Sequence, residues 1–204
     1  MTRHLQACLK IREVPLASPG GRARRPVRVF HLAVAGRWSP DYWMHLAVPV
    51  KRTLGDLDSF LRYTWLECCG HLSAFRIGNV SYDSGGMDEG ESESMESDLG
   101  SVVAPGMKFL HEYDFGTTTE LLLKVVGARE GAGFGRDIEV LARNDPPDIR
   151  CEACKKPATQ VCSQCIYDGP AWFCDACAKQ HECGEEMFLP VVNSPRVGMC
   201  GYTG

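Results

Sequence analysis

Apolar and polar residues alternate over several stretches of this chain, as they do in strands whose sheet has one buried face. The alternation begins at Val27 and covers residues 27–33, and residues 43–50, which follow a turn at Ser39-Pro40, are expected to form a second strand. It continues over residues 71–82, for which we expect one strand, and residues 138–141 form a further short candidate. These segments predict an ordered domain over residues 27–143.

Residues 108–126 have the pattern of a β-hairpin. Phe109, His111 and Tyr113 alternate before a turn at Asp114-Phe115-Gly116, and a returning strand follows from Thr117 to Val126. The aromatic and β-branched residues on both sides of the turn favour strands.

One amphipathic helix is expected between the second and third candidate strands. Thr53 can cap its first turn, and Asp56 stands three residues later, as in a capping box. Leu54, Leu57, Leu61 and Trp65 then follow a helical period. The stripe is typical of a helix that packs on a core, and Gly70 is expected to end it.

Two segments of opposite charge flank this pattern. Residues 1–28 hold seven Lys and Arg residues against Glu13 alone, and we interpret residues 1–26 as a flexible basic arm with a possible phosphate-binding role. Residues 83–98 hold seven Asp and Glu residues and no Lys or Arg. Their low apolar content predicts a mobile surface loop over residues 83–100. Their spacing is not that of an EF-hand.

Eight potential metal ligands follow within 33 residues, after a Pro-containing linker at 144–150. They form three CxxC pairs and one HxC pair: Cys151, Cys154, Cys162, Cys165, Cys174, Cys177, His181 and Cys183. Structural zinc is held by four thiolate or imidazole ligands in tetrahedral geometry, so the set suffices for two ions. No apolar leader follows Met1 and no apolar run is long enough to span a membrane, so we expect a cytoplasmic protein with reduced thiols. The sequence therefore predicts a two-zinc module over residues 151–183.

These eight ligands can be assigned to two ions in two ways. In an interleaved scheme, Cys151, Cys154, Cys174 and Cys177 hold one ion and the other four residues hold the second. This order resembles B-box and MYND modules. In a sequential scheme the first four ligands form one site and the last four the other. Cys177 and His181 would share a helix face four residues apart, which mildly favours the sequential scheme.

The other cysteines are scattered along the chain. Cys8, Cys68, Cys69 and Cys200 are interpreted as buried or inert thiols, and the adjacent pair as packing residues. After the module, residues 184–204 contain an apolar run at 187–192 that predicts a tail packed on the fold.

Charge and motifs narrow the range of functions. The net charge is −4, and the module carries three lysines against four acids, so phosphate binding by the module is disfavoured. Asp114-Phe115-Gly116 lacks the rest of a kinase signature, and Gly131–Gly135 is not a phosphate loop. Both are interpreted as turns. No catalytic residue is assigned, and a zinc with four protein ligands favours a structural role.

The middle of the chain resembles a known prokaryotic family. The residues that carry the likeness are PDYWMHLAVPVKRTLGDLDSFLR (40–62), Trp65, HLSAF (71–75), Tyr82 and YDFG (113–116). They resemble the Ri-plasmid open-reading-frame-three family, also described as insertion-element passenger proteins of TnpR type. The resemblance covers about residues 27–126 and implies a compact α+β domain with an antiparallel sheet and few helices. The family usually continues after YDFG with an acid, a Trp and a His, whereas this chain reads Thr-Thr-Thr-Glu-Leu.

These observations predict an α+β domain with an antiparallel sheet and one main helix, followed by a small two-zinc Cys/His module. The expected function is that of a non-catalytic zinc-binding interaction protein of a mobile-element or plasmid passenger family, with a protein as its partner and no membrane. One alternative is a nucleic-acid-associated accessory protein that binds weakly through the basic arm. Another is an enzyme around His111, Tyr113 and Asp114.

Overall fold

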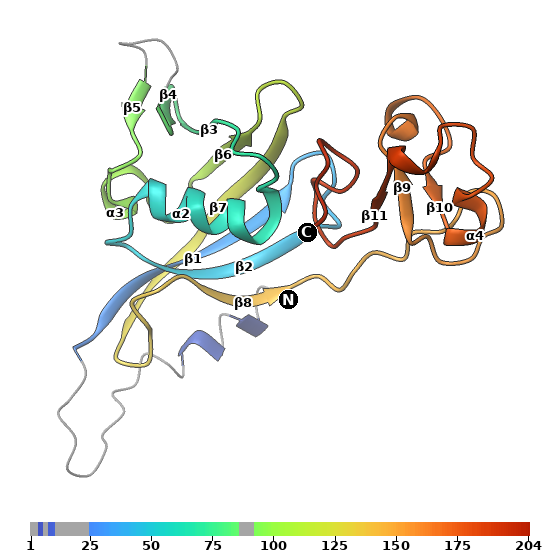
Figure 1. Ribbon diagram of the computed structural model, residues 1–204. Helices are drawn as coiled ribbons and strands as arrows, with labels where there is room; N and C mark the ends of the chain where they lie inside the picture. Colours follow the sequence, from blue (N-terminus) through green and yellow to red (C-terminus); the bar gives the residue numbers. More distant parts are fainter. Residues whose placement is uncertain (1–3, 6–7, 11–24, 86–91) are drawn as a thin grey trace.

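The computed structural model describes residues 4–5, 8–10, 25–85 and 92–204. One large sheet dominates a mixed α/β fold with few helices (Figure 1). The described strands follow one another across this sheet in the order β5-β4-β3-β6-β7-β1-β2-β8. Their bounds are β1 Val27–Gly36, β2 Trp43–Pro49, β3 Ser73–Ile77, β4 Val80–Asp83, β5 Ser92–Ser94, β6 Lys108–Tyr113, β7 Thr119–Gly131 and β8 Glu139–Arg143.

The sheet is largely antiparallel, as expected, but β4 and β5 pair in parallel. The hairpin of β6 and β7 is confirmed, with Tyr113 opposite Thr119 beside the turn. The prediction of one strand over residues 71–82 is wrong, because two antiparallel strands, β3 and β4, occupy it. Gly78 has a φ of 61°, a conformation that glycine adopts without steric cost, and it reverses the chain between them.

The acidic segment is more ordered than expected after residue 91. Ser92–Ser94 add strand β5 to the sheet, and helix α3 spans Leu99–Val102. Met95 and Leu99 are buried, and these two apolar side chains anchor the segment to the core. Residues 86–91 lie outside the described part. Most of the predicted basic arm also lies outside it, but Leu5 and Leu9 are helical and buried.

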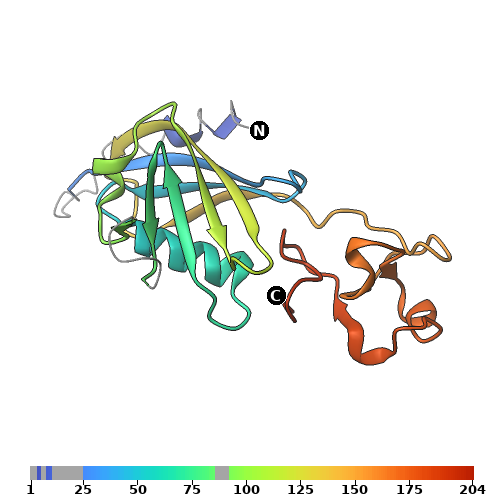
Figure 2. The same ribbon diagram turned by 90° about the horizontal axis from the view of Figure 1, so that it is seen from above.

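Helix α2 (Leu54–Leu61) continues into a π-helix, η1 (Arg62–Leu66). The predicted capping box is confirmed: the Asp56 N–H donates to Thr53 Oγ1, and the Thr53 N–H donates to the Asp56 carboxylate, each at 3.0 Å. Leu54, Leu57 and Trp65 are fully buried in the main core. The helix lies across one face of the large sheet (Figure 2).

The C-terminal part forms a second, smaller unit beside the sheet (Figure 1). A three-stranded antiparallel sheet in the order β10-β9-β11 is its centre. Its elements are β9 Gln160–Cys162, η2 Cys165–Tyr167, β10 Trp172–Phe173, α4 Asp175–Ala178, η3 Glu185–Met187 and β11 Phe188–Pro190.

The chain leaves the large sheet and returns to it at one point. The Asn144 side-chain amide donates to Asn193 Oδ1 at 2.7 Å, and the Asn193 amide donates to Asn144 O at 3.1 Å. Arg143 at the end of β8 also donates to Asn193 O. The two ends of the smaller unit are therefore held together by an amide clasp, Asn144–Asn193.

Residues 194–198, directly after the clasp, are buried between the two units. Ser194 Oγ donates to Trp65 O at 2.6 Å, and Val197 belongs to the same apolar cluster as Val161 of β9. Gly198 has a φ of 81°, and a Cβ there would lie 2.4 Å from Ile166 Cδ1. No larger side chain fits this close approach.

Two buried histidines face each other on β1 and β2. His31 Nε2 and His45 Nδ1 lie 2.9 Å apart, and His31 is 2% exposed. Burial, followed by the charges of His45 and Arg129, lowers the pKa of His31 from 6.5 to about 4. The pKa of His45 is also lowered, mainly by burial. The fold therefore keeps His31 neutral.

This pair predicts a loss of stability in mild acid. Unfolded chains bind a proton at His31 near pH 6.5, whereas the folded state binds it only near pH 4, so the free energy of unfolding falls as the pH drops between these values. From pH 6.5 to pH 5 the loss due to His31 should be about 2 kcal/mol. Denaturant unfolding of wild type and His31→Gln at both pH values measures it, since the variant should lose less. Equal losses would contradict the assignment.

The helix cap gives a second stability prediction. Thr53→Ala removes the side-chain acceptor of the Asp56 N–H and should lower the free energy of unfolding by about 1 kcal/mol. Ser59→Ala, on the exposed side of the same helix, is the matched control and should change stability little. Chemical denaturation compares the two, and similar effects would show that the cap contributes nothing specific.

Candidate metal centres

Tight turns place the ligands of the smaller unit around one short sheet. The Cys151 N–H donates to Lys156 O at 2.7 Å, and the Lys155 N–H donates back to Cys151 O at 2.9 Å. Lys155 adopts a positive φ of 63° to close this turn. Cys162 ends β9, and Cys174 caps helix α4. Each CxxC pair therefore lies on a turn or at an element end, where two sulfur atoms can point the same way.

The structure gathers the eight predicted ligands into two groups of four. Cys151, Cys154, Cys174 and Cys177 form the first group, and the other four residues form the second. Within each group all ligand atoms lie within 4.8 Å of one another. In the first group the sulfur atoms of Cys154 and Cys174 are 3.6 Å apart.

The second group has three sulfur atoms and one imidazole nitrogen. Cys165 Sγ lies 3.6 Å from Cys183 Sγ and 3.3 Å from His181 Nε2. The imidazole of His181 packs against Phe173, with ring centroids 4.6 Å apart, and against Phe188 at 5.5 Å. These aromatic contacts fix the orientation of the ring.

The grouping is interleaved, and the argument for sequential pairing is wrong. It required Cys177 and His181 to share a helix face, but α4 ends at Ala178 and His181 lies beyond it. A hydrogen bond from the Glu152 N–H to Trp172 O at 2.8 Å instead holds the first CxxC pair beside the third. The second CxxC pair then meets His181 and Cys183 on the other side.

Zinc(II) fits both donor sets. A tetrahedral zinc ion with Zn–S bonds of about 2.3 Å places its sulfur ligands about 3.8 Å apart, close to the separations in both groups. Each group supplies four protein ligands, so neither would leave an open position for substrate. Three Cys/His groups occur in the described part of the chain, and metal ions could occupy each of them.

The thiols of these groups differ in proton affinity. Burial alone would raise the pKa of Cys151, but backbone N–H groups from Cys174, Cys154 and Ala153 outweigh it and lower the pKa to about 6. Its neighbour Cys177 has a pKa raised to about 12, first by its hydrogen bond with Cys154. Four crowded thiols cannot all ionise alone, and a divalent cation supplies the positive charge that permits it.

Polar contacts around the ligands stabilise their turns. The Glu152 carboxylate accepts hydrogen bonds from the N–H groups of Ala171 at 2.5 Å and Trp172 at 3.0 Å. Asp175, beside Cys174, accepts from Thr159 Oγ1 at 2.6 Å. Such outer contacts orient the ligands of metal sites.

The residues of the enzyme alternative do not form one open site. His111 is fully buried, and its Nε2 lies 2.7 Å from Asp58 Oδ1. Asp114 is buried against Arg196, whose Nη2 donates to it at 2.6 Å. Tyr113 is also fully buried, and its hydroxyl donates to Glu67. All three take part in packing and internal hydrogen bonds, and Asp114 also forms an ion pair with Arg196.

The third group contains cysteines that the sequence left unassigned. Cys68, Cys69, His71 and Cys200 bring their ligand atoms within 4.8 Å of one another. The interpretation of Cys69 and Cys200 as buried thiols is wrong, since both are exposed and face a histidine, whereas Cys68 is half-buried. The closely spaced Cys-Cys-x-His run at 68–71 is the signal that could have suggested a metal site.

Comparisons with known proteins identify a similar fold. No protein-family model matches the chain, and no curated protein matches it. A solved structure, a protein of unknown function, MM3350, from Methanosarcina mazei Go1, is similar with a TM-score of 0.50 and 18% sequence identity. The match covers 57% of this chain and 70% of that one. In the described part of the chain, no helix is both long and apolar enough to cross a membrane.

Paired substitutions distinguish interleaved from sequential ligation. Cys154→Ser/Cys177→Ser removes two ligands from one interleaved site and should lower bound zinc by about one ion per chain relative to wild type. Cys154→Ser/Cys162→Ser damages both sites and should lower it by about two. Metal analysis of reduced, zinc-supplied protein measures the difference. The reverse order of losses would establish sequential pairing.

Proposed function

We propose that this chain is a non-catalytic, zinc-binding interaction protein whose smaller unit, held by two Zn²⁺ ions, contacts a protein partner. The main support for this proposal is the pair of interleaved four-ligand groups. Each has enough protein ligands to complete a tetrahedral site. Zinc in such sites supplies folding free energy and no reacting ligand position. The function then resides in the surface that the ions stabilise.

A groove on the smaller unit is the proposed contact surface. It has a volume of about 450 Å³ and lies beside helix α4. Its lining combines apolar and charged side chains: Gln160, Asp175, Ala178, Lys179, Glu185 and Phe188. Two carboxylates against one ammonium group disfavour a phosphate backbone, so a protein segment suits it better than nucleic acid.

We propose further that the chain belongs to the Ri-plasmid open-reading-frame-three family and has a mobile-element or plasmid origin. The blocks over residues 40–75 and YDFG at 113–116 support this proposal. In the structure they form β2, α2, β3 and the turn after β6. Leu54 and Phe75 of these blocks lie in the core, whereas Lys51, Arg52 and Asp56 line a cavity.

One structural feature supports the alternative that the chain binds nucleic acid. A cavity of about 700 Å³ near the start of β1 is lined by Arg28, Lys51, Arg52 and Arg136. Asp56 and Glu130 in the same lining offset part of this charge. Weak, salt-sensitive contact with phosphates through this region is the second candidate function.

Capture experiments from the native host decide between the two. Zinc-loaded protein should retain a protein partner after nuclease treatment, and Lys179→Glu in the groove should reduce the retained amount severalfold. Lys108→Glu, an exposed lysine on β6, is the matched control and should retain it fully. Retention that disappears with nuclease, and with deletion of residues 2–25, would favour the nucleic-acid function instead.

A further inference from the structure

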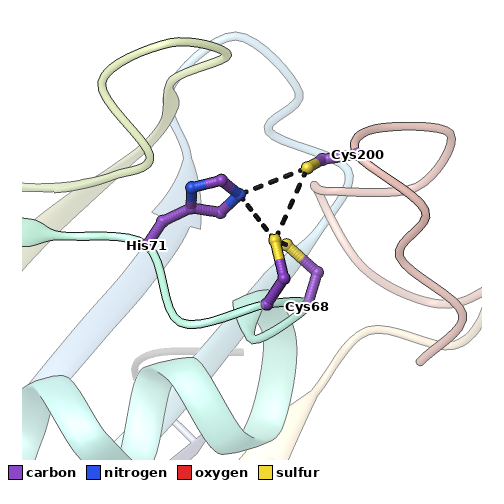
Figure 3. Close-up of side chains that lie close together, drawn as sticks. Cys68, His71 and Cys200 are labelled. Atoms are coloured by element: carbon purple, nitrogen blue, oxygen red, sulfur yellow. Dashed lines mark hydrogen bonds between the residues drawn. The ribbon is translucent and has the colours of Figure 1, made fainter.

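Cys68, Cys69, His71 and Cys200 come from two segments that are far apart in sequence. Cys68 and Cys69 follow the π-helix η1, and His71 precedes β3. Cys200 lies in the C-terminal segment, 131 residues after Cys69. Figure 3 shows Cys68, His71 and Cys200 pointing toward one another from these segments.

The distances in this group match those of the two module groups. Cys69 Sγ lies 3.7 Å from Cys68 Sγ and 3.8 Å from Cys200 Sγ. His71 Nε2 lies 3.0 Å from Cys69 Sγ and 3.2 Å from Cys200 Sγ. Sulfur ligands of a tetrahedral zinc ion are about 3.8 Å apart, whereas a disulfide needs about 2.05 Å. The group thus has the spacing of a metal site and not that of a disulfide.

The loop that carries three of the ligands is held rigidly. Glu67 Oε1 accepts from the Gly70 N–H at 2.6 Å and from the Tyr113 hydroxyl at 3.0 Å, while its other oxygen accepts from Arg62 at 2.7 Å. Gly70 has a φ of 80°, which lets the chain turn between Cys69 and His71. Such preorganisation lowers the entropy cost of collecting ligands around an ion.

The buried residue Arg196 positions the segment that carries the fourth ligand, Cys200. Its Nη2 donates to Asp114 at 2.6 Å and to Cys68 Sγ at 3.4 Å, and Nη1 donates to Thr117 O at 3.0 Å. A cationic donor beside Cys68 favours its thiolate form, the form that binds metal. Cys200 follows four residues later, with an uncommon φ of 46° that directs the chain at this point.

We propose that Cys68, Cys69, His71 and Cys200 form a third metal site, which binds a zinc(II) ion through three thiolates and one imidazole. The donor set has the same composition as the second module group, Cys162, Cys165, His181 and Cys183. Unlike the module sites, it joins the C-terminal segment to the loop between η1 and β3. The ion cross-links two segments that otherwise meet through Arg196 and neighbouring contacts.

Metal analysis of the full chain tests this site. Reduced, zinc-supplied wild type should bind about one more zinc ion per chain than Cys200→Ser or Cys69→Ser. Both side chains are exposed, so these substitutions leave the core intact, and circular dichroism checks the fold. Cys8→Ser, at another exposed cysteine, is the matched control and should bind as much zinc as wild type.

Cobalt(II) provides an independent readout. The wild-type spectrum minus that of Cys200→Ser should show the absorption of one tetrahedral cobalt ion with thiolate ligands. The Cys200-dependent ion should persist in Cys154→Ser/Cys177→Ser, because that variant removes only module ligands. Equal metal content in wild type and Cys200→Ser would overturn the proposal. So would a Cys69–Cys200 disulfide in protein kept under reductant.

Discussion

A buried ion pair between Arg196 and Asp114 determines how the parts of this protein are assembled. Arg196 is fully buried, and a guanidinium removed from water needs an anion and several acceptors around it. It finds them in Asp114, Thr117 O and Thr119 Oγ1, and it lies 4.8 Å above the ring of Tyr113. The turn after β6 and the start of β7 supply these groups where the C-terminal segment passes. The ion pair with Asp114 therefore fixes the position of the C-terminal segment on the large sheet more narrowly than apolar contacts alone would.

The neighbouring contacts depend on that position. With Arg196 in place, Val197 joins the apolar cluster that includes Val161, and Gly198 passes close to Ile166 of the smaller unit. Cys200 then meets the loop after η1. One ion pair thus sets the relation between the sheet, the smaller unit and the proposed third metal site. Removal of either charge alone would leave the other buried without its partner, which is costly in a protein interior.

Features encoded by residues close in sequence could be predicted from the chain. The capping box at Thr53 and Asp56 depends on residues three apart, and six of the eight candidate metal ligands in the smaller unit come in CxxC pairs. The hairpin of β6 and β7 is local too. Patterns of this kind survive folding because tertiary contacts reinforce them rather than compete with them.

Features that depend on contacts between residues far apart in sequence could not be predicted from the chain. The order β5-β4-β3-β6-β7-β1-β2-β8 and the parallel edge pair are not encoded in any single strand. The interleaved grouping depends on a contact between Glu152 and Trp172, which are far apart in sequence, and the third group needs Cys200, which no spacing connects to Cys69. The order of the segment after residue 91 is not evident from its sequence. Met95 and Leu99 are isolated among acidic residues, and elements from elsewhere in the chain bury them.

The Asn144–Asn193 clasp has a consequence for how such a chain can be rearranged. Because the two ends of the smaller unit meet at one pair of amides, the unit is an excursion from the large sheet that starts and finishes at the same place. Insertions with adjacent ends are tolerated by host domains, since the host chain continues as if uninterrupted. A short loop from residue 144 to residue 193 would close the same gap, but it would also remove Val161 and Ile166, which Gly198 approaches closely. The topology is thus that of an insertion: the smaller unit lies between β8 and the C-terminal segment in the chain, and it also packs on that segment.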